Sequence, residues 1–341
     1  MSIRALIVDD SAFARKIVRE MVSSDPAIEV VGSARDGEEA IELTESLGPD
    51  IVVCDLRMPR LDGVAFVRRQ MRRRPLPILI LSAAAQDADE IVDALNAGAI
   101  DVVRKPSALA VDDLRAVRDE LIEKVKAAAA APVANLTGER AGRPEVAARR
   151  ETRFDLVVIG ISTGGPQALR RLLPAFPADF PVPIAIVLHM PVGYTALYAE
   201  KLNEICALDV GEAADGDLLR PGRVLLAQAG RHLGFHRNAD GQTVAELLLQ
   251  PLDKLHRPSA DVLFRSAATV FGDRVLAVVM TGMGDDGKEG AAWVKAHGGV
   301  VLTEAQKSCV IYGMPRSVEE AGLSDASIPL ADMAQAIFSR I

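Results

Sequence analysis

The chain has 341 residues, a formal net charge of −8, 49% hydrophobic residues and 4% aromatic residues. This length predicts two domains, and the composition predicts cores of valine, isoleucine, leucine and alanine. The acidic balance argues against duplex nucleic acid or an anionic membrane as the main partner, because both attract basic surfaces. Three cysteines without metal-type spacing, no signal peptide and no membrane-length apolar run predict a cytoplasmic protein without membrane insertion.

The first half of the chain alternates short apolar runs with amphipathic segments. The apolar runs predict strands, and apolar residues at helical spacing, such as Ile17, Met21 and Val22, predict the helices between them. Five βα units in series predict a flavodoxin-like parallel sheet with helices on both faces. The expected strands are Ala5–Val8, Val30–Gly32, Ile51–Cys54, Ile78–Leu81 and Asp101–Val103, and helices are expected near 12–23, 38–47, 63–72, 87–96 and 112–126.

A run of arginines falls within the third expected helix and just beyond it. Such a run is more often a solvated helix face than a binding patch, and we expect the solvated face and end of one helix here. The run consists of Arg68, Arg69, Arg72, Arg73 and Arg74.

The sequence changes character between about Ala127 and Thr152. This stretch is rich in alanine, then contains prolines and glycines, and holds few large apolar residues. Such a segment buries too little surface to offset its ordering entropy, so it is predicted to be a linker over 127–152. Residues 1–126 and 153–341 are then the two domains, and the alanines are expected to extend the preceding helix by a turn or two.

Polar residues follow four of the strands expected in the first half. Asp9 and Asp10 follow the first strand, Asp55 the third, Ser82 the fourth and Lys105 the fifth. The carboxyl ends of parallel strands share one edge of a sheet, so these side chains should converge. Three converging carboxylates repel each other without a cation, and oxygen ligands suit Mg2+. A carboxylate can accept a phosphoryl group, whose oxygens Mg2+, Lys105 and Ser82 would stabilise.

Residues 1 to about 126 resemble a response-regulator receiver domain. The matching segments are Leu6-Ile-Val-Asp-Asp10, Asp55-Leu-Arg-Met-Pro59 with Asp62-Gly63, Ser82-Ala83, and Ala97 to Asp101 through Lys105-Pro106. The resemblance implies that Asp55 is the phosphoacceptor, that Ser82 is the switch hydroxyl and that Lys105 contacts the phosphoryl group. It implies a Mg2+ site formed by Asp9, Asp10, Asp55 and the Arg57 carbonyl, and a cis bond before Pro106. Val102 stands where many receivers carry an aromatic switch residue, so activation through an aromatic rotamer is not expected.

Alternation resumes at Phe154 and predicts a second α/β domain, doubly wound and mostly parallel. Expected strands are Leu156–Ile159, Ile184–Leu188, Arg223–Ala227, Val275–Met280 and Val300–Thr303, with His232–His236 and Thr243–Leu248 as a small antiparallel excursion. Helices are expected near 166–173, 195–204, 259–271, 287–297 and 331–340.

The segment Gly160-Ile-Ser162-Thr-Gly164 lies between an expected strand and an expected helix. A serine on a glycine-flanked turn of this kind has the nucleophile-elbow arrangement, in which the hydroxyl is held where a base and a substrate reach it. The alternatives are a glycine-rich phosphate-binding turn and an ordinary strand-to-helix turn. Residues elsewhere in the chain must decide between them.

Among the five histidines, His189 is the best-placed base for Ser162, because it directly follows the apolar run Ile184–Leu188. A third group should orient the imidazole, and either Asp285 or Asp286 could serve, since each lies where it could also cap a helix. The same turn offers backbone N–H groups, that of Met283 among them, to a developing oxyanion. The order Ser, His, Asp differs from that of the α/β-hydrolases.

Residues from about 153 onward resemble the catalytic domain of the chemotaxis protein-glutamate methylesterases, the CheB family. The matching segments are Gly160-Ile-Ser-Thr-Gly-Gly165, His189-Met-Pro-Val-Gly-Tyr-Thr195, Arg257-Pro-Ser-Ala-Asp261, Leu263-Phe-Arg-Ser266, Thr281-Gly-Met-Gly-Asp-Asp-Gly287 and Ser308-Cys-Val-Ile-Tyr-Gly-Met-Pro315. The resemblance implies Ser162 as nucleophile, His189 as base and Asp286 as catalytic carboxylate. It also places Thr163 next to the nucleophile and makes the Met283 backbone an oxyanion donor.

Together the resemblances imply a phosphorylation-activated serine hydrolase of bacterial chemotaxis. Its substrates would be glutamate methyl esters, and glutamines to be deamidated, on methyl-accepting chemoreceptors, and its phosphodonor a chemotaxis sensor histidine kinase. Mg2+ is expected in the receiver domain, and no cofactor is expected for ester hydrolysis. Two alternatives are a receiver-regulated esterase or acyltransferase of another pathway, and a non-catalytic phospho-switched scaffold.

Overall fold

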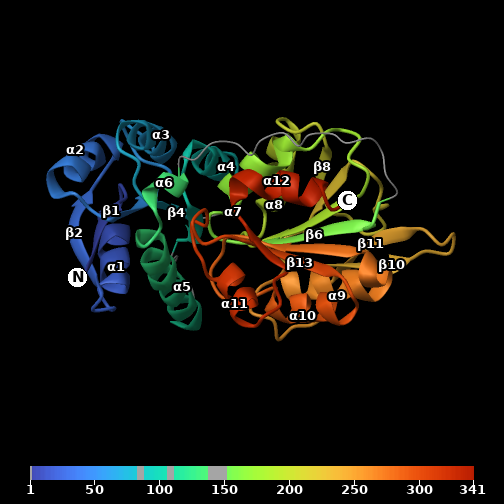
Figure 1. The fold of residues 1–341 in the computed structure, drawn as a ribbon. Coiled ribbons are helices and arrows are strands. Elements are labelled where there is room, and N and C mark those ends of the chain that lie inside the picture. The colour runs from blue at the N-terminus through green and yellow to red at the C-terminus, as the bar shows by residue number, and fades with distance from the viewer. Residues whose placement is uncertain (1, 83–87, 106–110, 137–151) are drawn as a thin grey trace. The chain divides into compact units, whose positions relative to one another are not determined.

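The computed structural model describes residues 2–82, 88–105, 111–136 and 152–341. The chain divides into two compact units, residues 1–138 and 139–341, and each unit is described by itself (Figure 1). The cis bond predicted before Pro106 and most of the linker predicted over 127–152 lie outside the described residues. No helix in these ranges combines the length and the apolar character needed to cross a membrane.

The first unit is a parallel five-stranded sheet with the strand order β2-β1-β3-β4-β5, which is the predicted flavodoxin-like order. Its strands are β1 (Ile3–Val8), β2 (Ile28–Ala34), β3 (Ile51–Asp55), β4 (Ile78–Ser82) and β5 (Asp101–Arg104). Its helices are α1 (Ala12–Val22), α2 (Gly37–Leu47), α3 (Gly63–Arg73), α4 (Ala88–Ala97), α5 (Val111–Ala129) and α6 (Val133–Leu136). The predicted strands and helices are confirmed, and the alanines extend α5 to Ala129 as expected.

Helix α3 shows how the sequence determines both a helix start and its two faces. The Asp62 carboxylate accepts a hydrogen bond from the Ala65 N–H and thereby caps the helix start. Phe66 and Val67 are buried, and the helix packs against α2 and α4. The five arginines of the run are exposed on the opposite face and at the helix end, which confirms the predicted solvated face.

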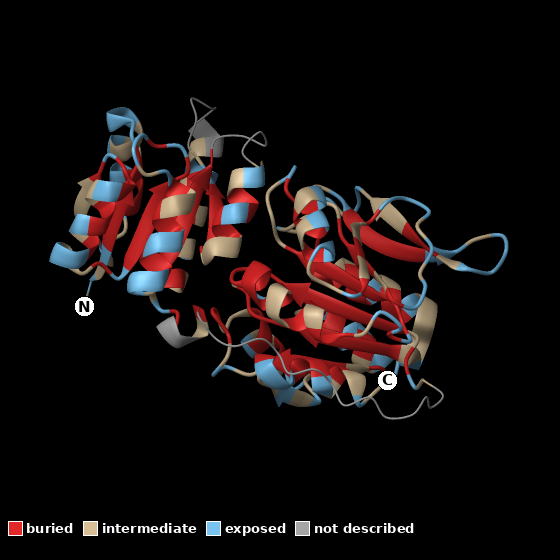
Figure 2. Ribbon diagram, turned by 90° about the horizontal axis from the view of Figure 1, so that it is seen from above, coloured by how far each residue is buried: buried red, intermediate tan, exposed pale blue. Residues whose placement is uncertain are grey.

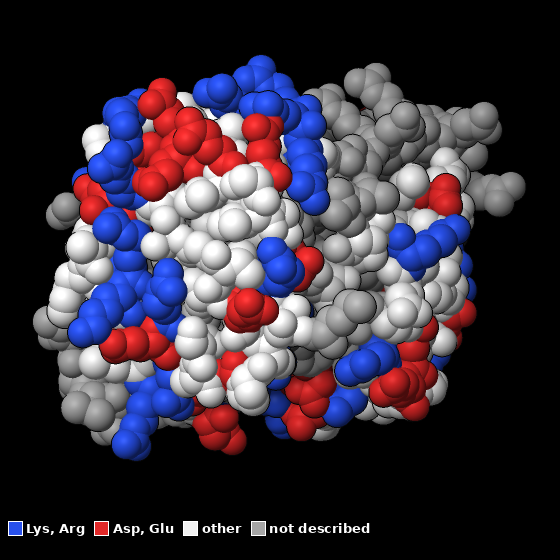
Figure 3. Space-filling view, turned by 90° about the vertical axis from the view of Figure 1, so that its left-hand side faces the viewer, with Lys and Arg blue, Asp and Glu red and all other residues white. Residues whose placement is uncertain are grey.

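Charges of both signs are intermixed on the surface of the first unit. Arg73 of α3 pairs with Glu45 of α2, and Arg57 pairs with Glu90 at 3.0 Å. Figure 3 shows basic side chains bordering a compact group of acidic ones on this face. Within the arginine run, Glu45 therefore partly balances the charge of Arg73.

The second unit is built on a parallel seven-stranded sheet with the order β14-β13-β12-β6-β7-β9-β8, to which an antiparallel hairpin is added. The sheet strands are β6 (Leu156–Ile161), β7 (Ile184–Leu188), β8 (Asp209–Glu212), β9 (Arg223–Leu226), β12 (Val275–Val279), β13 (Val300–Glu304) and β14 (Ala326–Ile328). The hairpin, which was predicted, joins β10 (His232–Arg237) and β11 (Thr243–Leu248).

Helices cover both faces of this second sheet, with α7, α8 and α12 on one face and α9, α10 and α11 on the other (Figure 1). Their bounds are α7 (Gly165–Leu172), α8 (Thr195–Asn203), α9 (Ala260–Phe271), α10 (Lys288–Ala296), α11 (Met314–Glu320) and α12 (Leu330–Phe338). This is the predicted doubly wound, mostly parallel architecture.

Three elements of the second unit were not predicted: β8, β14 and α11. Strands β8 and β14 form the two edges of the sheet, and most of their residues are only half-buried or exposed. An edge strand needs no continuous apolar run, so the signal that revealed the central strands is missing there. Helix α11 is only seven residues long, too short for a helical period to stand out.

The central strands form the buried layer of the second unit. Every residue of β6, β7 and β12 is buried, and Figure 2 shows buried residues running along the strands of both units. Replacing one such residue, for example Leu276, by alanine is expected to cost about 2–5 kcal/mol. This rigid layer fixes the positions of the three turns that leave the carboxyl ends of its strands.

The strand order of the second sheet reverses at β6, so that later strands are added on its other side. After β6 it forms β7, β8 and β9 on one side, where they lie in the spatial order β7-β9-β8, and later β12, β13 and β14 on the other side. In open α/β sheets ligands bind outside the carboxyl ends of the strands at such a switch point. The carboxyl ends of β12, β6 and β7 are therefore where a site is expected.

Candidate functional site

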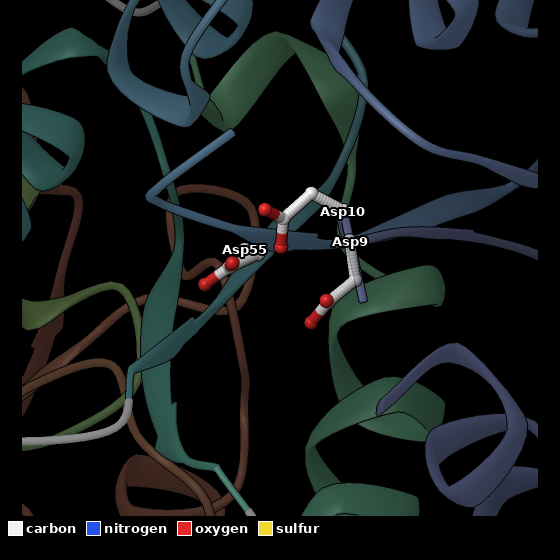
Figure 4. A group of neighbouring side chains, drawn as sticks. All are labelled: Asp9, Asp10 and Asp55. Atoms are coloured by element: carbon white, nitrogen blue, oxygen red, sulfur yellow. The ribbon is translucent and has the colours of Figure 1, made fainter. Parts of the chain in front are cut away.

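Three carboxylates meet at the carboxyl edge of the first sheet, as the sequence predicted. Asp9 and Asp10 follow β1, and Asp55 ends β3, the strand beside it. One oxygen from each of the three residues lies within 4.8 Å of the others, and Figure 4 shows the side chains gathered at the strand ends. Asp9 and Asp55 are buried, whereas Asp10 is exposed.

Lys105 compensates part of this negative charge. Its Nζ lies 2.7 Å from Asp9 Oδ2 and 2.9 Å from Asp55 Oδ2, where it follows the end of β5. Burial raises the pKa of Asp55 although Lys105 opposes the shift. Burial disfavours the charge of Lys105, but its bonds to Asp55 and Asp9 outweigh this and raise its pKa. We call Asp9, Asp10, Asp55, Ser82 and Lys105 the acidic site.

The remaining predicted members lie around these carboxylates. Ser82 is buried at the end of β4, where its carbonyl accepts a hydrogen bond from the Lys105 N–H at 2.6 Å. Arg57 lines a pocket of about 490 Å3 together with Asp10, Asp62 and Glu90. The possible ligands are the closely spaced carboxylate oxygens of Asp9, Asp10 and Asp55, two of which also bond to Lys105. Oxygen ligands of this kind fit a Mg2+ ion. Val102, which stands where many receiver domains carry an aromatic switch residue, is buried in β5.

Strand register brings Ser162 and His189 side by side in the second unit. Ile161 of β6 pairs with Leu188 of β7, and the next residue of each strand is the predicted nucleophile or base. Paired strands lie about 4.8 Å apart, and the His189 N–H donates to the Ile161 carbonyl at 3.1 Å. On the other side, the Ser162 N–H donates to the Thr281 carbonyl at 3.0 Å.

The turn around Ser162 depends on two glycines. Gly164 has φ +79°, a backbone conformation that favours glycine, and it opens the way into α7. At Gly282, which approaches from the turn after β12, a Cβ atom would lie 2.7 Å from the Ser162 Cβ. Gly164 thus allows the sharp turn after Ser162, and Gly282 allows the turn after β12 to approach Ser162 closely. Ser162 itself is 8% exposed.

The ring of His189 is held by Asp286. The His189 Nε2 lies 2.8 Å from Asp286 Oδ2. The other ring nitrogen, Nδ1, is buried and has no hydrogen-bond partner among the described residues. With Nε2–H donating to the carboxylate, Nδ1 is the basic nitrogen available to a neighbouring hydroxyl. We call Ser162, His189 and Asp286 the serine site.

The structure distinguishes between the two aspartates that the residue pattern left open, of which the resemblance implied Asp286. Asp285 is exposed and pairs with Lys288 at 2.8 Å, whereas Asp286 faces His189. Asp286 Oδ2 accepts the Ala260 N–H at 2.7 Å, and Oδ1 accepts the N–H groups of Asp261 and Gly287, each at 3.1 Å. Burial opposes the negative charge, but His189 and these donors outweigh it and hold the pKa of Asp286 well below its usual range.

Helices α9 and α10 exchange capping carboxylates. Asp286, which lies just before α10, accepts N–H groups from the start of α9. Asp261, in the first turn of α9, accepts the N–H groups of Gly287 and Gly290 at 2.9 and 2.8 Å. Each helix start thus supplies positive dipole to the other's carboxylate. This reciprocal arrangement locks the position of Asp286 relative to the sheet.

The turn after β12 also presents a backbone donor. The Met283 N–H donates to no acceptor within the described part of the chain. The turn is held by Thr281, whose N–H donates to Glu304 Oε2 at 2.9 Å and whose hydroxyl donates to the Thr163 carbonyl at 3.0 Å. Thr163 is buried, so it supports the turn beside the nucleophile. The predicted oxyanion donor therefore lies on a braced turn next to Ser162.

Comparisons with known proteins agree with this arrangement. The family model described as CheB methylesterase matches residues 157–337, and the model described as response regulator receiver domain matches residues 5–117. The protein-glutamate methylesterase/protein-glutamine glutaminase 5 of Myxococcus xanthus is 50% identical over 335 residues, which are 97% of this chain and 96% of that protein. The chain belongs to the CheB methylesterase family.

Two further comparisons support the family at the level of the whole chain and of the second unit. A protein-glutamate methylesterase/protein-glutamine glutaminase of Halalkalibacterium halodurans is 42% identical over 341 residues, covering 98% of this chain and 97% of that protein. The crystal structure of the Thermotoga maritima CheB methylesterase catalytic domain matches with a TM-score of 0.54 and 38% identity. It covers 55% of this chain and 99% of that structure.

In this CheB family member, sequence reasoning did not reveal the neighbours of the triad. The ring of His256 stacks on that of His189, with centroids 4.1 Å apart and planes at 26°. His256 also lines a pocket of about 220 Å3 with Ser259, Gly284 and Asp286. It lies in a loop without helical or strand periodicity, so no sequence pattern marked it.

The remaining histidines and Cys309 take no direct part in the serine site. His236 is exposed, and His297 follows α10, where its Nδ1 lies 2.8 Å from the Trp293 carbonyl. Cys309 is buried, and burial raises the pKa of its thiol far above the usual range, which makes it a poor nucleophile. His232 is fully buried behind Ser259.

Proposed function

We propose that this protein is a phosphorylation-activated protein-glutamate methylesterase and protein-glutamine glutaminase of bacterial chemotaxis. Its substrates are glutamate methyl esters and glutamines on methyl-accepting chemoreceptors. The proposal is carried by one observation: the His189–Asp286 hydrogen bond lies beside Ser162 at the switch point of the second sheet. The names of whole-length relatives support the substrate.

In the proposed reaction Ser162 attacks the ester carbonyl and transfers its proton to His189 Nδ1. Asp286 keeps the proton on Nε2 and stabilises the imidazolium that forms. The Met283 N–H donates a hydrogen bond to the oxyanion, and Thr163, the residue after Ser162, assists it. His189 then protonates the leaving methoxide, and Ser162 remains as an acyl ester. Water gives a proton to His189 and attacks the carbonyl of this ester, and His189 returns the proton to Ser162 as glutamate is released. The same steps release ammonia from glutamine, because only the leaving group differs.

The acidic site provides the proposed regulation. Asp55 accepts a phosphoryl group from a chemotaxis sensor histidine kinase, and Lys105 and Ser82 contact the transferred group. Asp9, Asp10, Asp55 and the Arg57 carbonyl would hold Mg2+, which neutralises charge on the phosphoryl oxygens when bound. Phosphorylation shifts a conformational equilibrium of the protein toward the form with higher hydrolytic activity. Hydrolysis itself uses only the residues of the second unit and no cofactor.

The direct test replaces the proposed nucleophile. We expect Ser162→Ala to lower methanol release from methylated receptor by about 10,000-fold or more, because the triad acts as a unit. Phosphorylation of Asp55 should be unchanged in this variant. Cys309→Ala is the matched control and should retain activity, since its buried thiol takes no part. Methanol release by Ser162→Ala at the wild-type rate would refute the assignment.

A second arm separates this function from its alternatives. An esterase of another pathway would turn over a simple ester but leave methylated receptor intact. A non-catalytic scaffold would turn over neither. The reciprocal bonding of Asp286 argues against the scaffold, because a carboxylate with so many donors is built to hold the His189 ring.

A further inference from the structure

Ser259 occupies the N-cap position of α9 but does not cap that helix. Its side chain makes no capping hydrogen bond to α9. Instead its hydroxyl donates to Asp286 Oδ1 at 2.7 Å, and the residue is 1% exposed. Asp286 fulfils the capping role, through the Ala260 and Asp261 N–H groups. A residue type that normally serves its own helix is thus directed at the triad carboxylate.

His232 holds Ser259 from behind. Its Nδ1 accepts the Ser259 N–H at 3.2 Å, and its Nε2 lies 3.0 Å from the Pro251 carbonyl. An acceptor at one nitrogen and a donor at the other define a single neutral tautomer, protonated at Nε2. His232 lies in β10 and is fully buried. Burial lowers its pKa, which favours the neutral form that this bonding requires.

We propose that His232 and Ser259 are positioning residues of the hydrolytic reaction, acting through Asp286. A continuous chain runs from the Pro251 carbonyl through His232 and Ser259 to Asp286, and from there to His189. This inference rests on the proposed function, because it assumes that Ser162 and His189 perform the chemistry.

The physical reason lies in how the two oxygens of Asp286 are used. Oδ2 faces His189, so the carboxylate must not rotate about its Cβ–Cγ bond as the imidazole gains and loses charge. The other donors to Asp286 are backbone N–H groups, and Ser259 supplies the one side-chain hydroxyl among the described residues that bonds to Oδ1. A hydroxyl bonding to a carboxylate is among the stronger hydrogen bonds in proteins. Its loss should therefore reduce the precision with which Asp286 holds the ring.

The first experiment compares Ser259→Ala with Ser259→Thr in the full chain, using p-nitrophenyl acetate as substrate. We expect kcat of Ser259→Ala to fall about 10- to 100-fold, the effect of one bond to a buried charge, with KM within about twofold. Ser259→Thr keeps the hydroxyl and should lie within about threefold of wild type. A kcat of Ser259→Ala within twofold of wild type would overturn the inference.

A cysteine variant covers the case in which Ser259→Ala does not fold. Ser259→Cys retains the side-chain volume but offers only a weak donor. It should reproduce the loss of kcat while the unfolding midpoint stays near that of wild type. Wild-type kcat in Ser259→Cys would overturn the role of the hydroxyl.

The second experiment addresses His232. His232→Asn places an amide oxygen where Nδ1 accepts the Ser259 N–H, whereas His232→Leu offers no acceptor. We expect kcat of the asparagine variant to exceed that of the leucine variant by about 10-fold, because only the leucine leaves a buried N–H unpaired. Equal kcat values for the two variants would remove His232 from the chain.

A spectroscopic readout separates failure of this inference from failure of the proposed function. In protein labelled with 15N-histidine, the His189 Nε2–H signal reports its bond to Asp286 without any turnover. Ser259→Ala should shift this signal, and Ser259→Thr should leave it near the wild-type position. An unshifted signal in Ser259→Ala overturns the inference, whatever the substrate of the enzyme is. Absence of Ser162-dependent ester turnover in wild type would instead count against the proposed function.

Discussion

The two sites occupy the same place in two parallel sheets, yet they balance their buried carboxylates by different means. In the acidic site a single side chain, that of Lys105, bonds to both Asp9 and Asp55. In the serine site, backbone N–H groups from the starts of two helices surround Asp286. The pKa of Asp55 is raised by burial, whereas that of Asp286 is lowered by its hydrogen bonds despite burial.

The difference has a functional meaning. Charge compensated by a lysine side chain, and by a cation when one binds, can be redistributed when a phosphoryl group arrives. Charge compensated by backbone donors is fixed by the fold and costs no reorganisation during the reaction. The first arrangement suits a switch, and the second suits a catalyst that must offer the same geometry at each turnover.

The largest expected effect comes from removing the charge of Asp286, which backbone donors hold in place. Asp286→Asn should lower kcat by about 1,000-fold or more, because an amide cannot hold the Nε2–H tautomer of His189 as a carboxylate does. Ester hydrolysis by the purified variant measures this. Asp285→Asn is the matched control, since Asp285 is exposed and pairs with Lys288. Equal activity of the two asparagine variants would contradict the assignment of Asp286.

Removing the charge of Lys105 in the acidic site should affect phosphorylation but not hydrolysis. Lys105→Met removes the cation between Asp9 and Asp55, and we expect the rate of Asp55 phosphorylation to fall about 100-fold. Hydrolysis by the unphosphorylated protein should stay within about twofold of wild type. Phosphate incorporation and ester turnover are measured on the same preparation.

The control for this comparison is Lys126→Met, because Lys126 is more exposed and pairs only with Asp25 among the described residues. It should leave both rates unchanged. Removal of Mg2+ by a chelator should abolish phosphorylation in wild type and leave basal hydrolysis intact. Loss of basal hydrolysis on chelation would contradict the separation of the two sites.

The reciprocal caps offer a smaller test. Asp261→Ala leaves the Gly290 N–H without its side-chain acceptor and leaves the Gly287 N–H only its longer bond to Asp286 Oδ1. The variant should lose about 2–4 kcal/mol of unfolding free energy. Because Asp286 directly precedes Gly287 and bonds to His189, loosening this helix start should also displace Asp286 and lower kcat about 10-fold. Asp261→Asn keeps one oxygen and should recover most of both losses. Urea unfolding and ester turnover measure the two effects, and a kcat unchanged in Asp261→Ala would show that the exchange of caps serves stability alone.

Glu304 gives the smallest expected effect, on the pH dependence of stability. Burial raises the pKa of Glu304 from 4.5 to about 7, although bonds from Thr281 and Ser308 oppose the shift. The folded protein therefore holds a proton that the unfolded chain releases above about pH 4.5. Its contribution is present below that pH and is lost as pH rises through about 7.

The test is the replacement Glu304→Gln, which removes the titrating group but keeps an oxygen acceptor. Between pH 4.5 and 7 the unfolding free energy of wild type should fall relative to that of the variant, as measured by urea unfolding at several pH values. Parallel pH profiles for the two proteins would contradict the raised pKa.

The sequence was sufficient for the central part of each sheet and for the residues that leave it. Buried parallel strands are apolar throughout, so β6, β7 and β12 were evident, and the residues after them had to meet at one edge. This is why Ser162 and His189 could be predicted together. The edge strands β8 and β14 lacked that signal and were missed.

The supports of the site could not be predicted, for a different reason. The residue pattern could not choose between Asp285 and Asp286, because two consecutive residues before a helix have no periodic signal to distinguish them. Only the family resemblance implied Asp286, the residue whose side chain faces His189. Ser259 has the sequence pattern of an ordinary N-cap, and only the packing of α9 against the β12 turn directs its hydroxyl to Asp286. Such contacts join residues far apart in the chain.

The central claim is that phosphorylation of Asp55 raises the rate of the hydrolysis that Ser162, His189 and Asp286 perform. The most direct measurement is methanol release from methylated receptor by the full chain, with Mg2+ present, before and after addition of acetyl phosphate. The account predicts that acetyl phosphate raises the rate in wild type, has no effect in Asp55→Asn, and produces no release in Ser162→Ala. An increase that persists in Asp55→Asn, or equal rates with and without acetyl phosphate in wild type, would contradict it.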